Sequence, residues 1–181
     1  MNVIGRKALA QASYLSRLGR LARLALLCLI GTASGAQAQQ GWITDANGCK
    51  IANPNPRPTE SVKWNGACVD GFADGQGVMQ WYSDSAPGPR YEGNLRRGVV
   101  SGRGKLTLPD GSMYDGEWSD GKQQGTGTLT TADGTSYQGE WKNGEPDGRG
   151  TMRDASGQSV TGNWKAGRYI GPGDEDTEKN K

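Results

Sequence analysis

The chain has 181 residues, with 30 Gly, 8 Pro, one Phe and a hydrophobic content of only 33%, a composition typical of either a flexible chain or a glycine-punctuated repeat. It contains no His and three Cys. This excludes catalytic triads with a histidine base, His-ligated zinc sites and zinc sites made of four cysteines. The formal net charge of +2 comes from the first 38 residues, which carry five basic and no acidic side chains.

Residues 1–38 are predicted to be a secretory signal peptide. Basic residues precede an apolar run at 24–30, and small residues then lead to Ala36 and Ala38, which is the order of a leader with an A-x-A cleavage site. We expect cleavage near Ala38 and export to the periplasm or the extracellular space; an uncleaved anchor and an organelle transit peptide are the alternatives. The mature chain then holds 16 basic and 19 acidic residues, so nucleic-acid binding is not expected.

Residues 39–62 are predicted to be an N-terminal cap or linker. Two cysteines remain after cleavage, Cys49 and Cys68, and an exported chain with an even number of cysteines favours a disulfide between them over two free thiols. We expect this bond to tether residues 49–62 to the first hairpin of the repeat array that follows.

Residues 63–173 repeat with a period of 23 residues, marked by glycines and aromatic residues together. The first column of the repeat holds Tyr91, Tyr114, Tyr137 and Val160. Gly and then Leu or Trp follow at 93/95, 116/118, 139/141 and 162/164, and Gly-x-Gly pairs stand at 102/104, 125/127, 148/150 and 171/173. An earlier copy begins at Trp64, and the four extra residues before the next copy are expected in a lengthened loop over the Pro-rich segment 85–89.

Each copy is predicted to be a β-hairpin. Residue types alternate along 113–118, so that Tyr114, Gly116 and Trp118 share one face. Asp-Gly or Asn-Gly pairs at 110–111, 120–121, 133–134 and 143–144 supply the positive φ angles of tight turns. Glycines within the strands leave room for a ring to lie across the neighbouring strand. The predicted fold class is all-β: an elongated single-layer antiparallel meander of about five stacked hairpins.

One face of the predicted sheet carries the aromatic stripe, defined as Tyr91, Tyr114, Trp118, Tyr137, Trp141 and Trp164. We interpret most of it as the core, because few other residues are able to form one. A single sheet cannot fully cover its own face, so the stripe is also the candidate surface for a protein partner or a second copy of the chain. Alternatives are stacking of exposed rings on cell-wall glycan, and membrane-lipid headgroups, which a mature charge of about −3 disfavours.

Two enzymatic interpretations are considered and disfavoured. The Gly-x-Gly pairs open a strand in every copy and lack the following helix that a nucleotide-binding loop requires. Glu117 and Glu140 lie one repeat apart on the polar face, about 9.5 Å by strand spacing, but a general acid needs burial to raise its pKa. No catalytic, cofactor-binding or metal-binding residue is predicted.

Both ends of the array depart from the pattern. Cys68 stands where later copies have Trp, and Val160 replaces Tyr in the last copy, as expected for terminal units that cap a stack. Residues 174–181 are charged and carry no apolar side chain, which predicts a disordered tail.

The pattern Tyr-x-Gly-x-Trp-x-x-Gly-x-x-x-Gly-x-Gly on this period resembles the MORN (membrane occupation and recognition nexus) repeat family. Residues 114–121 and 137–144 match it best, and residues 48–68 look like the N-terminal part of exported bacterial MORN proteins. The resemblance implies a scaffold, a dimerisation surface or a phospholipid-binding module. We therefore expect a non-enzymatic interaction protein of the cell envelope that binds a protein partner or itself through an aromatic groove.

Overall fold

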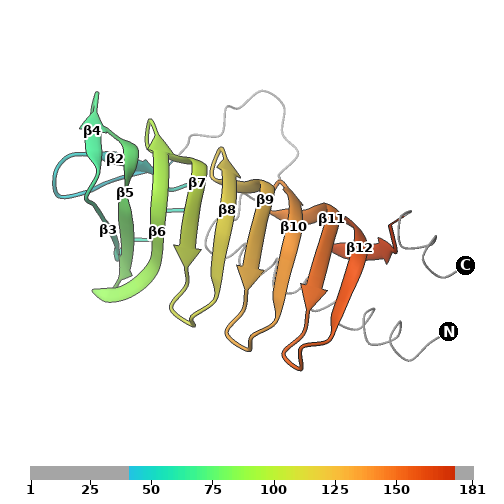
Figure 1. Cartoon of the computed structure of the whole chain (residues 1–181). Helices are drawn as coiled ribbons and strands as arrows, with labels where there is room; N and C mark the ends of the chain where they lie inside the picture. Colours follow the sequence, from blue (N-terminus) through green and yellow to red (C-terminus); the bar gives the residue numbers. More distant parts are fainter. Residues whose placement is uncertain (1–40, 174–181) are drawn as a thin grey trace, which may run out of the picture.

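A computed structural model describes residues 41–173, so the predicted signal peptide (1–38) and tail (174–181) lie outside the described residues. Within this range all strands belong to one sheet of 13 strands (Figure 1). The predicted all-β class is thereby confirmed. The described residues include no helix long and apolar enough to cross a membrane.

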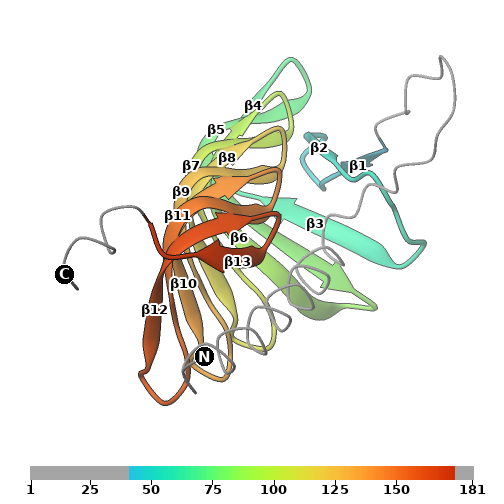
Figure 2. The same cartoon turned by 90° about the vertical axis from the view of Figure 1, so that its right-hand side faces the viewer.

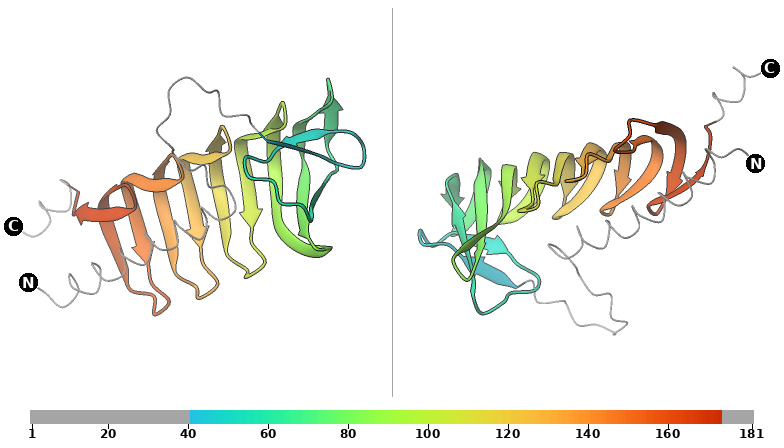
Figure 3. Two further views of the ribbon diagram at one scale, coloured as in Figure 1. Left: turned by 180° about the vertical axis from the view of Figure 1, so that it is seen from behind. Right: turned by 90° about the horizontal axis from the view of Figure 1, so that it is seen from below.

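Nine consecutive strands form the repeat array. They are β5 (Phe72–Ser83), β6 (Ala86–Arg96), β7 (Val99–Thr107), β8 (Met113–Ser119), β9 (Lys122–Thr130), β10 (Ser136–Lys142), β11 (Glu145–Arg153), β12 (Ser159–Lys165) and β13 (Arg168–Gly171). Each pairs antiparallel with the next. The result is an elongated, twisted meander (Figure 3), as the repeat predicts.

Tight two-residue turns connect the strands along one edge of the sheet, which we call the turn edge. The turn residues are Asp70-Gly71, Arg97-Gly98, Asp120-Gly121, Asn143-Gly144 and Ala166-Gly167, and all ten have positive φ. Positive φ at both central positions defines the type I′ turn, whose twist matches that of the flanking strands. The Gly of each Asp-Gly or Asn-Gly pair on this edge therefore has the role that the sequence predicts.

Ala166 and Arg97 are the two first residues of these turns that are neither Asp nor Asn. Ala166 has a φ of +47°, a region that costs an L-residue other than Gly, Asn or Asp about 1–2 kcal/mol. We expect Ala166→Asn to raise the free energy of unfolding by about 1 kcal/mol. Chemical denaturation would measure this gain. Arg168→Asn, two residues away at an exposed position of β13, serves as the control, and a gain of equal size there would contradict the explanation from turn geometry.

Five-residue loops connect the repeats along the opposite edge, which we call the loop edge. In the loop at 131–135, Thr131 N–H donates to the Thr135 carbonyl at 2.8 Å, and Gly134 N–H donates to the Thr131 carbonyl at 2.9 Å. The loops at 108–112 and 154–158 repeat both bonds. The N-terminal loop at 45–49 has the same pattern, so the chain uses this loop once more outside the recognised repeats.

The Pro-rich segment 85–89 is not a loop, and this prediction was wrong. Asp84 and Ser85 form another turn with positive φ at both residues, and the four extra residues lengthen β5 and β6. Pro87 lies opposite Tyr82 in β5. The pairing of β6 with β7 begins only at Arg90, so the two prolines lie where no neighbouring strand requires their missing N–H.

A line of glycines crosses the sheet at its centre. Directly paired residues along this line are Gly77, Gly93, Gly104, Gly116, Gly127, Gly139, Gly150 and Gly162. We call it the glycine spine. Register shifts beside it mark β-bulges. In these bulges the first Gly of the Gly-x-Gly pair, such as Gly125 (φ +64°), takes a conformation that favours glycine.

The N-terminal cap covers one end of the array. It comprises the hairpin of β1 (Trp42–Thr44) and β2 (Lys50–Ala52), followed by β3 (Glu60–Trp64) and β4 (Ala67–Val69). β3 and β4 both pair antiparallel with β5, so the boundary predicted between residues 62 and 63 falls inside a strand. The predicted Cys49–Cys68 disulfide is present, with the two Cα atoms 5.6 Å apart, and it links the β1–β2 loop to β4.

Candidate functional site

The aromatic stripe lies in the interior of the protein. Its six side chains are at most 6% exposed. Tyr and Trp alternate along the array with T-shaped contacts, for example Tyr114 against Trp141 at 5.0 Å and Tyr137 against Trp164 at 5.1 Å between ring centroids. The contacts run without a break from Tyr91 to Tyr169. Edge-to-face pairs of this kind add stability beyond the burial of their area.

The polar atoms of these rings are satisfied by backbone carbonyls. Trp118 Nε1 donates to the Gly104 carbonyl at 2.9 Å, and Trp141 and Trp164 repeat the bond one and two repeats later. Tyr114 Oη donates to the Glu117 carbonyl at 3.1 Å, and Tyr137 does the same with Glu140. The glycine spine is thus part of the same arrangement, because it carries the rings and supplies the acceptors for Trp.

The curvature of the sheet explains this burial. The strands bend around one side of the sheet, and the β1–β2 hairpin lies on that concave side (Figure 2). Ile51 of this hairpin belongs to the same buried cluster as the rings, which places the stripe on the concave side. These six rings contact one another and the spine and are not exposed. The aromatic stripe is therefore the core, and neither the expected partner surface nor the alternative of stacking on glycan is formed by these six residues.

Tyr169 is a ring of the stack that the sequence pattern does not identify. In the last repeat Val160 stands in the Tyr column, and Tyr169 extends back from β13 to cover Gly162. Its ring packs against Trp164 at 5.4 Å, and its Oη donates to the Thr161 carbonyl at 3.4 Å. The last repeat therefore closes the stack with a ring from the second strand of the hairpin.

The buried tyrosines make stability depend on alkaline pH. Burial raises the pKa of Tyr91 to about 12, and it also raises the pKa values of Tyr114 and Tyr137. Because the unfolded phenol ionises near pH 10, their stabilising contribution is fully present below pH 10 and is lost as the pH rises through the folded-state pKa. We expect these three phenols to ionise only together with unfolding, as followed by absorbance at 295 nm and circular dichroism. Ionisation of all tyrosines near pH 10 in a folded protein would contradict this.

The two carboxylates considered as a catalytic pair stabilise the β-bulges. Glu117 Oε1 accepts hydrogen bonds from Thr126 Oγ1 at 2.7 Å and from Thr126 N–H at 3.0 Å. These bonds lower the pKa of Glu117, whereas a general acid needs a raised one. Glu140 Oε1 accepts from Arg149 N–H in the same way. Residues 41–173 also hold no group of three His, Cys, Asp or Glu side chains suited to a metal ion.

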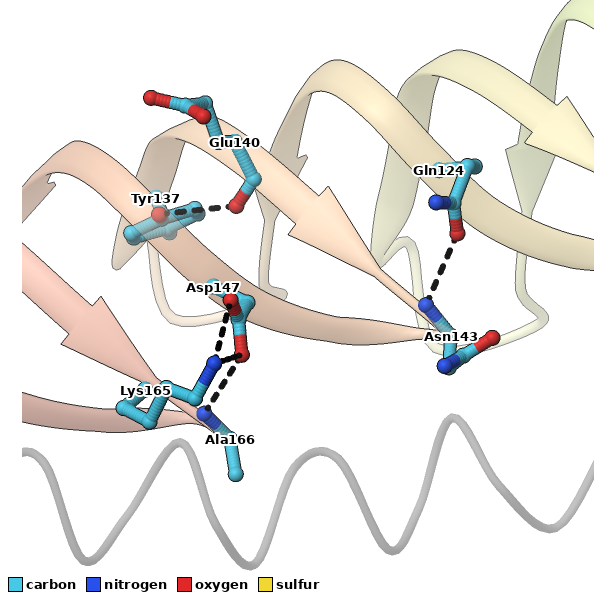
Figure 4. A network of polar contacts seen from close by, with 7 residues as sticks. All are labelled: Gln124, Tyr137, Glu140, Asn143, Asp147, Lys165 and Ala166. Atoms are coloured by element: carbon cyan, nitrogen blue, oxygen red, sulfur yellow. Dashed lines mark hydrogen bonds and ion pairs between the residues drawn. The ribbon is translucent and has the colours of Figure 1, made fainter.

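Neighbouring repeats contact each other through a regular set of bonds at the turn edge, shown in Figure 4. Asp147 in β11 pairs with Lys165 Nζ at 3.2 Å and accepts from Ala166 N–H at 3.4 Å. One repeat earlier, Gln124 Oε1 accepts from Asn143 N–H at 3.0 Å. These contacts join the turns at Asn143 and Ala166 to the strand of the preceding repeat.

The family model for the MORN repeat matches residues 69–85, 91–113, 114–136 and 137–159. The chain belongs to the MORN-repeat proteins. MORN repeats are in general interaction modules for proteins or membranes, and the family is typically non-catalytic. The matched segments contain the stacked rings except Trp164 and Tyr169, and most of the glycine spine, so the features that define a MORN repeat here are those of its core. A comparison with curated proteins finds no match.

The surface that this MORN array offers on its concave side is an apolar column beside the rings. Leu106, Leu129 and Val160 are half-buried there and pack against the buried cluster. Leu106 and Leu129 are one repeat apart in the same column, and Met152, which follows them in this column, is only 2% exposed. Val160 lies beside Met152 in β12 and takes the Tyr position of the last repeat. All three half-buried residues lie toward the loop edge. Sequence alternation places these residues on the same face as the rings. It does not tell which residues of that face are fully buried, as the rings are, and which are half-buried, because this depends on the curvature of the sheet.

Proposed function

We propose that this MORN-repeat protein is a non-enzymatic interaction protein of the cell envelope that binds a protein partner on its concave side. The half-buried column of Leu106, Leu129 and Val160 is the observation that supports a protein partner, because a row of partly covered apolar side chains on a concave surface suits an apolar segment of another protein. The location rests on the predicted signal peptide. The partner contacts this column and not the buried rings.

The polar side of the sheet supports the non-enzymatic part of the proposal. Glu117 is held in its charged form by the bonds that stabilise a bulge, so it is unsuited to proton transfer near neutral pH. Glu117 and Glu140 both have a structural role at the bulges. This supports an interaction surface and not a catalytic site.

Site-specific photocrosslinking tests the proposal. A photoreactive residue at position 129 is expected to form a discrete protein adduct in the native envelope. The matched control is position 128, because Thr128 is also half-buried but lies on the opposite face. Adducts of equal yield at both positions, or at neither, would refute binding on the concave side.

Two sedimentation assays separate the alternative ligands. The mature protein is expected to remain in the supernatant with purified peptidoglycan and with vesicles of anionic phospholipid. Co-sedimentation with peptidoglycan that Leu129→Lys abolishes and Thr128→Lys leaves intact would replace the protein partner by a glycan. The same result with vesicles would replace it by a lipid surface.

A further inference from the structure

The most exposed large hydrophobic residues of the described chain lie at the two ends of the array. They are Trp42 (38% exposed) and Val69 (50%) at the N-terminal end, and Ile170 (65%) at the C-terminal end. Along the turn edge between these ends, the positions equivalent to Val69 and Ile170 are polar. An apolar residue on a solvated surface needs no explanation when it stands alone, but a pair at opposite ends of an open stack suggests that the ends meet.

Val69 and Ile170 occupy the two columns that join neighbouring repeats. The column of Ile170 holds Asp74, Ser101, Gln124 and Asp147, and the column of Val69 holds Arg96, Ser119, Lys142 and Lys165. Within the array these two columns contact each other between repeats, as the ion pair of Asp147 with Lys165 shows (Figure 4). If a second chain were placed where the next repeat would be, Ile170 of the first chain would lie against Val69 of the second.

The two edge strands have matching directions. Within the described residues β13 pairs only with β12, and β4 pairs only with β5. Antiparallel pairing alternates from β5 to β13, so β13 runs in the same direction as β5 and opposite to β4. Both strands lie in the half of the sheet next to the turn edge. A β4 strand placed beside β13 of another copy would therefore continue the antiparallel order of the sheet.

The backbone bonds at the turn edge follow the same series. The glycine N–H of each turn donates to a carbonyl of the preceding repeat: Gly121 to Val100 at 3.0 Å, Gly144 to Gln123 at 3.0 Å and Gly167 to Pro146 at 2.9 Å. The next carbonyl of this series is that of Tyr169 in β13, and the first turn glycine is Gly71. If a second copy followed the first, its Gly71 N–H would reach the Tyr169 carbonyl of the first copy. A backbone carbonyl is able to accept two hydrogen bonds.

We propose that copies of this protein join head to tail, with β4 of one copy pairing with β13 of another and Val69 packing on Ile170. The sheet then continues from one chain into the next with the contacts that connect its own repeats. Such an interface is heterologous, so it generates open chains of copies, or a ring where the rotation between copies closes, instead of a two-fold dimer. The contact is small, and assembly is therefore expected to depend on concentration. It uses the ends of the array and leaves the concave column to a different partner.

Analytical ultracentrifugation of the mature chain tests the interface. The weight-average mass is expected to rise continuously with concentration. Ile170→Asp and Val69→Lys are each expected to weaken association at least tenfold. The double variant is expected to recover most of it, because it recreates the Asp–Lys pair found between internal repeats. Ser119→Asp, in the column of Val69 but inside the array, is the matched control. A monomer at all concentrations, or single variants that associate as the parent does, would overturn the proposal.

Cysteine crosslinking distinguishes a head-to-tail contact from a symmetric one. A chain with Val69→Cys and a chain with Ile170→Cys are expected to form a mixed disulfide dimer when combined under oxidising conditions, while neither forms a dimer alone. A chain with both changes is expected to give a ladder of multimers. Dimers of either single variant by itself would refute the head-to-tail arrangement. Unchanged melting temperatures show that the variants fold, and the crosslink at position 129 tests the concave side separately.

Discussion

Trp141→Ala is expected to lower the free energy of unfolding by about 3–5 kcal/mol, the range for removing a large buried ring. Trp141 is 5% exposed and lies between Tyr114 and Tyr137, with centroid distances of 5.0 and 5.3 Å. Its loss removes both contacts and the hydrogen bond to the Gly127 carbonyl. Chemical denaturation followed by tryptophan fluorescence and circular dichroism would measure the change.

The position of Trp141 in the array makes the effect larger than a local one. In a stack of repeats each unit is stabilised mainly by its neighbours, so a gap in the middle weakens the contacts on both sides. Trp42→Ala is the control, since Trp42 is 38% exposed and makes one ring contact, with Phe72. We expect it to cost about 1 kcal/mol. If the two variants were equally stable, the ring stack would not be the core of the protein.

The repeat period predicts most of the fold because its signals are local. An Asn-Gly pair such as Asn143-Gly144 specifies a turn by backbone geometry alone, and alternation along 113–118 specifies which residues share a face. Neither signal depends on how distant parts of the chain pack. This explains why the hairpins and their order follow from the sequence.

The fate of the aromatic stripe could not be predicted in the same way. Alternation places Tyr114 and Trp118 on one face, but whether that face is open or closed depends on the curvature, which arises from bulges at glycines such as Gly125. Tyr169 was missed for a related reason, since its column holds Val100 and Pro146 in earlier repeats. It covers Gly162 in the one repeat where Val160 stands in place of the Tyr whose ring covers the equivalent glycine elsewhere.

The Pro-rich segment 85–89 shows a limit of composition as a guide. Proline and glycine usually mark loops, but here they extend an edge of the sheet where the second neighbour is missing. The longer hairpin gives β5 the residues that pair with β3, and this pairing is a contact between the cap and the array. No signal within 85–89 reports that contact.

Gly127→Ala is expected to lower the free energy of unfolding by at least about 3 kcal/mol, at the upper end of overpacking costs. An added Cβ at Gly127 would lie 2.5 Å from Tyr114 Cζ, well inside van der Waals contact. The Tyr114 ring cannot move aside, because Trp118 and Trp141 pack against it at 5.1 and 5.0 Å. The backbone of Gly127 does not have positive φ, so the cost comes from the ring and not from the main-chain conformation.

Gly134→Asn provides the matched comparison for this steric argument. Gly134 has a φ of +85° and open space where a Cβ would lie, and Asn tolerates this conformation better than other residues with a side chain. We expect a loss of no more than about 1 kcal/mol in the same denaturation assay. Equal losses for the two variants would show that any glycine in the array is replaceable at the same cost. A large loss at Gly127 alone would show that the spine is glycine because the Tyr rings lie on it.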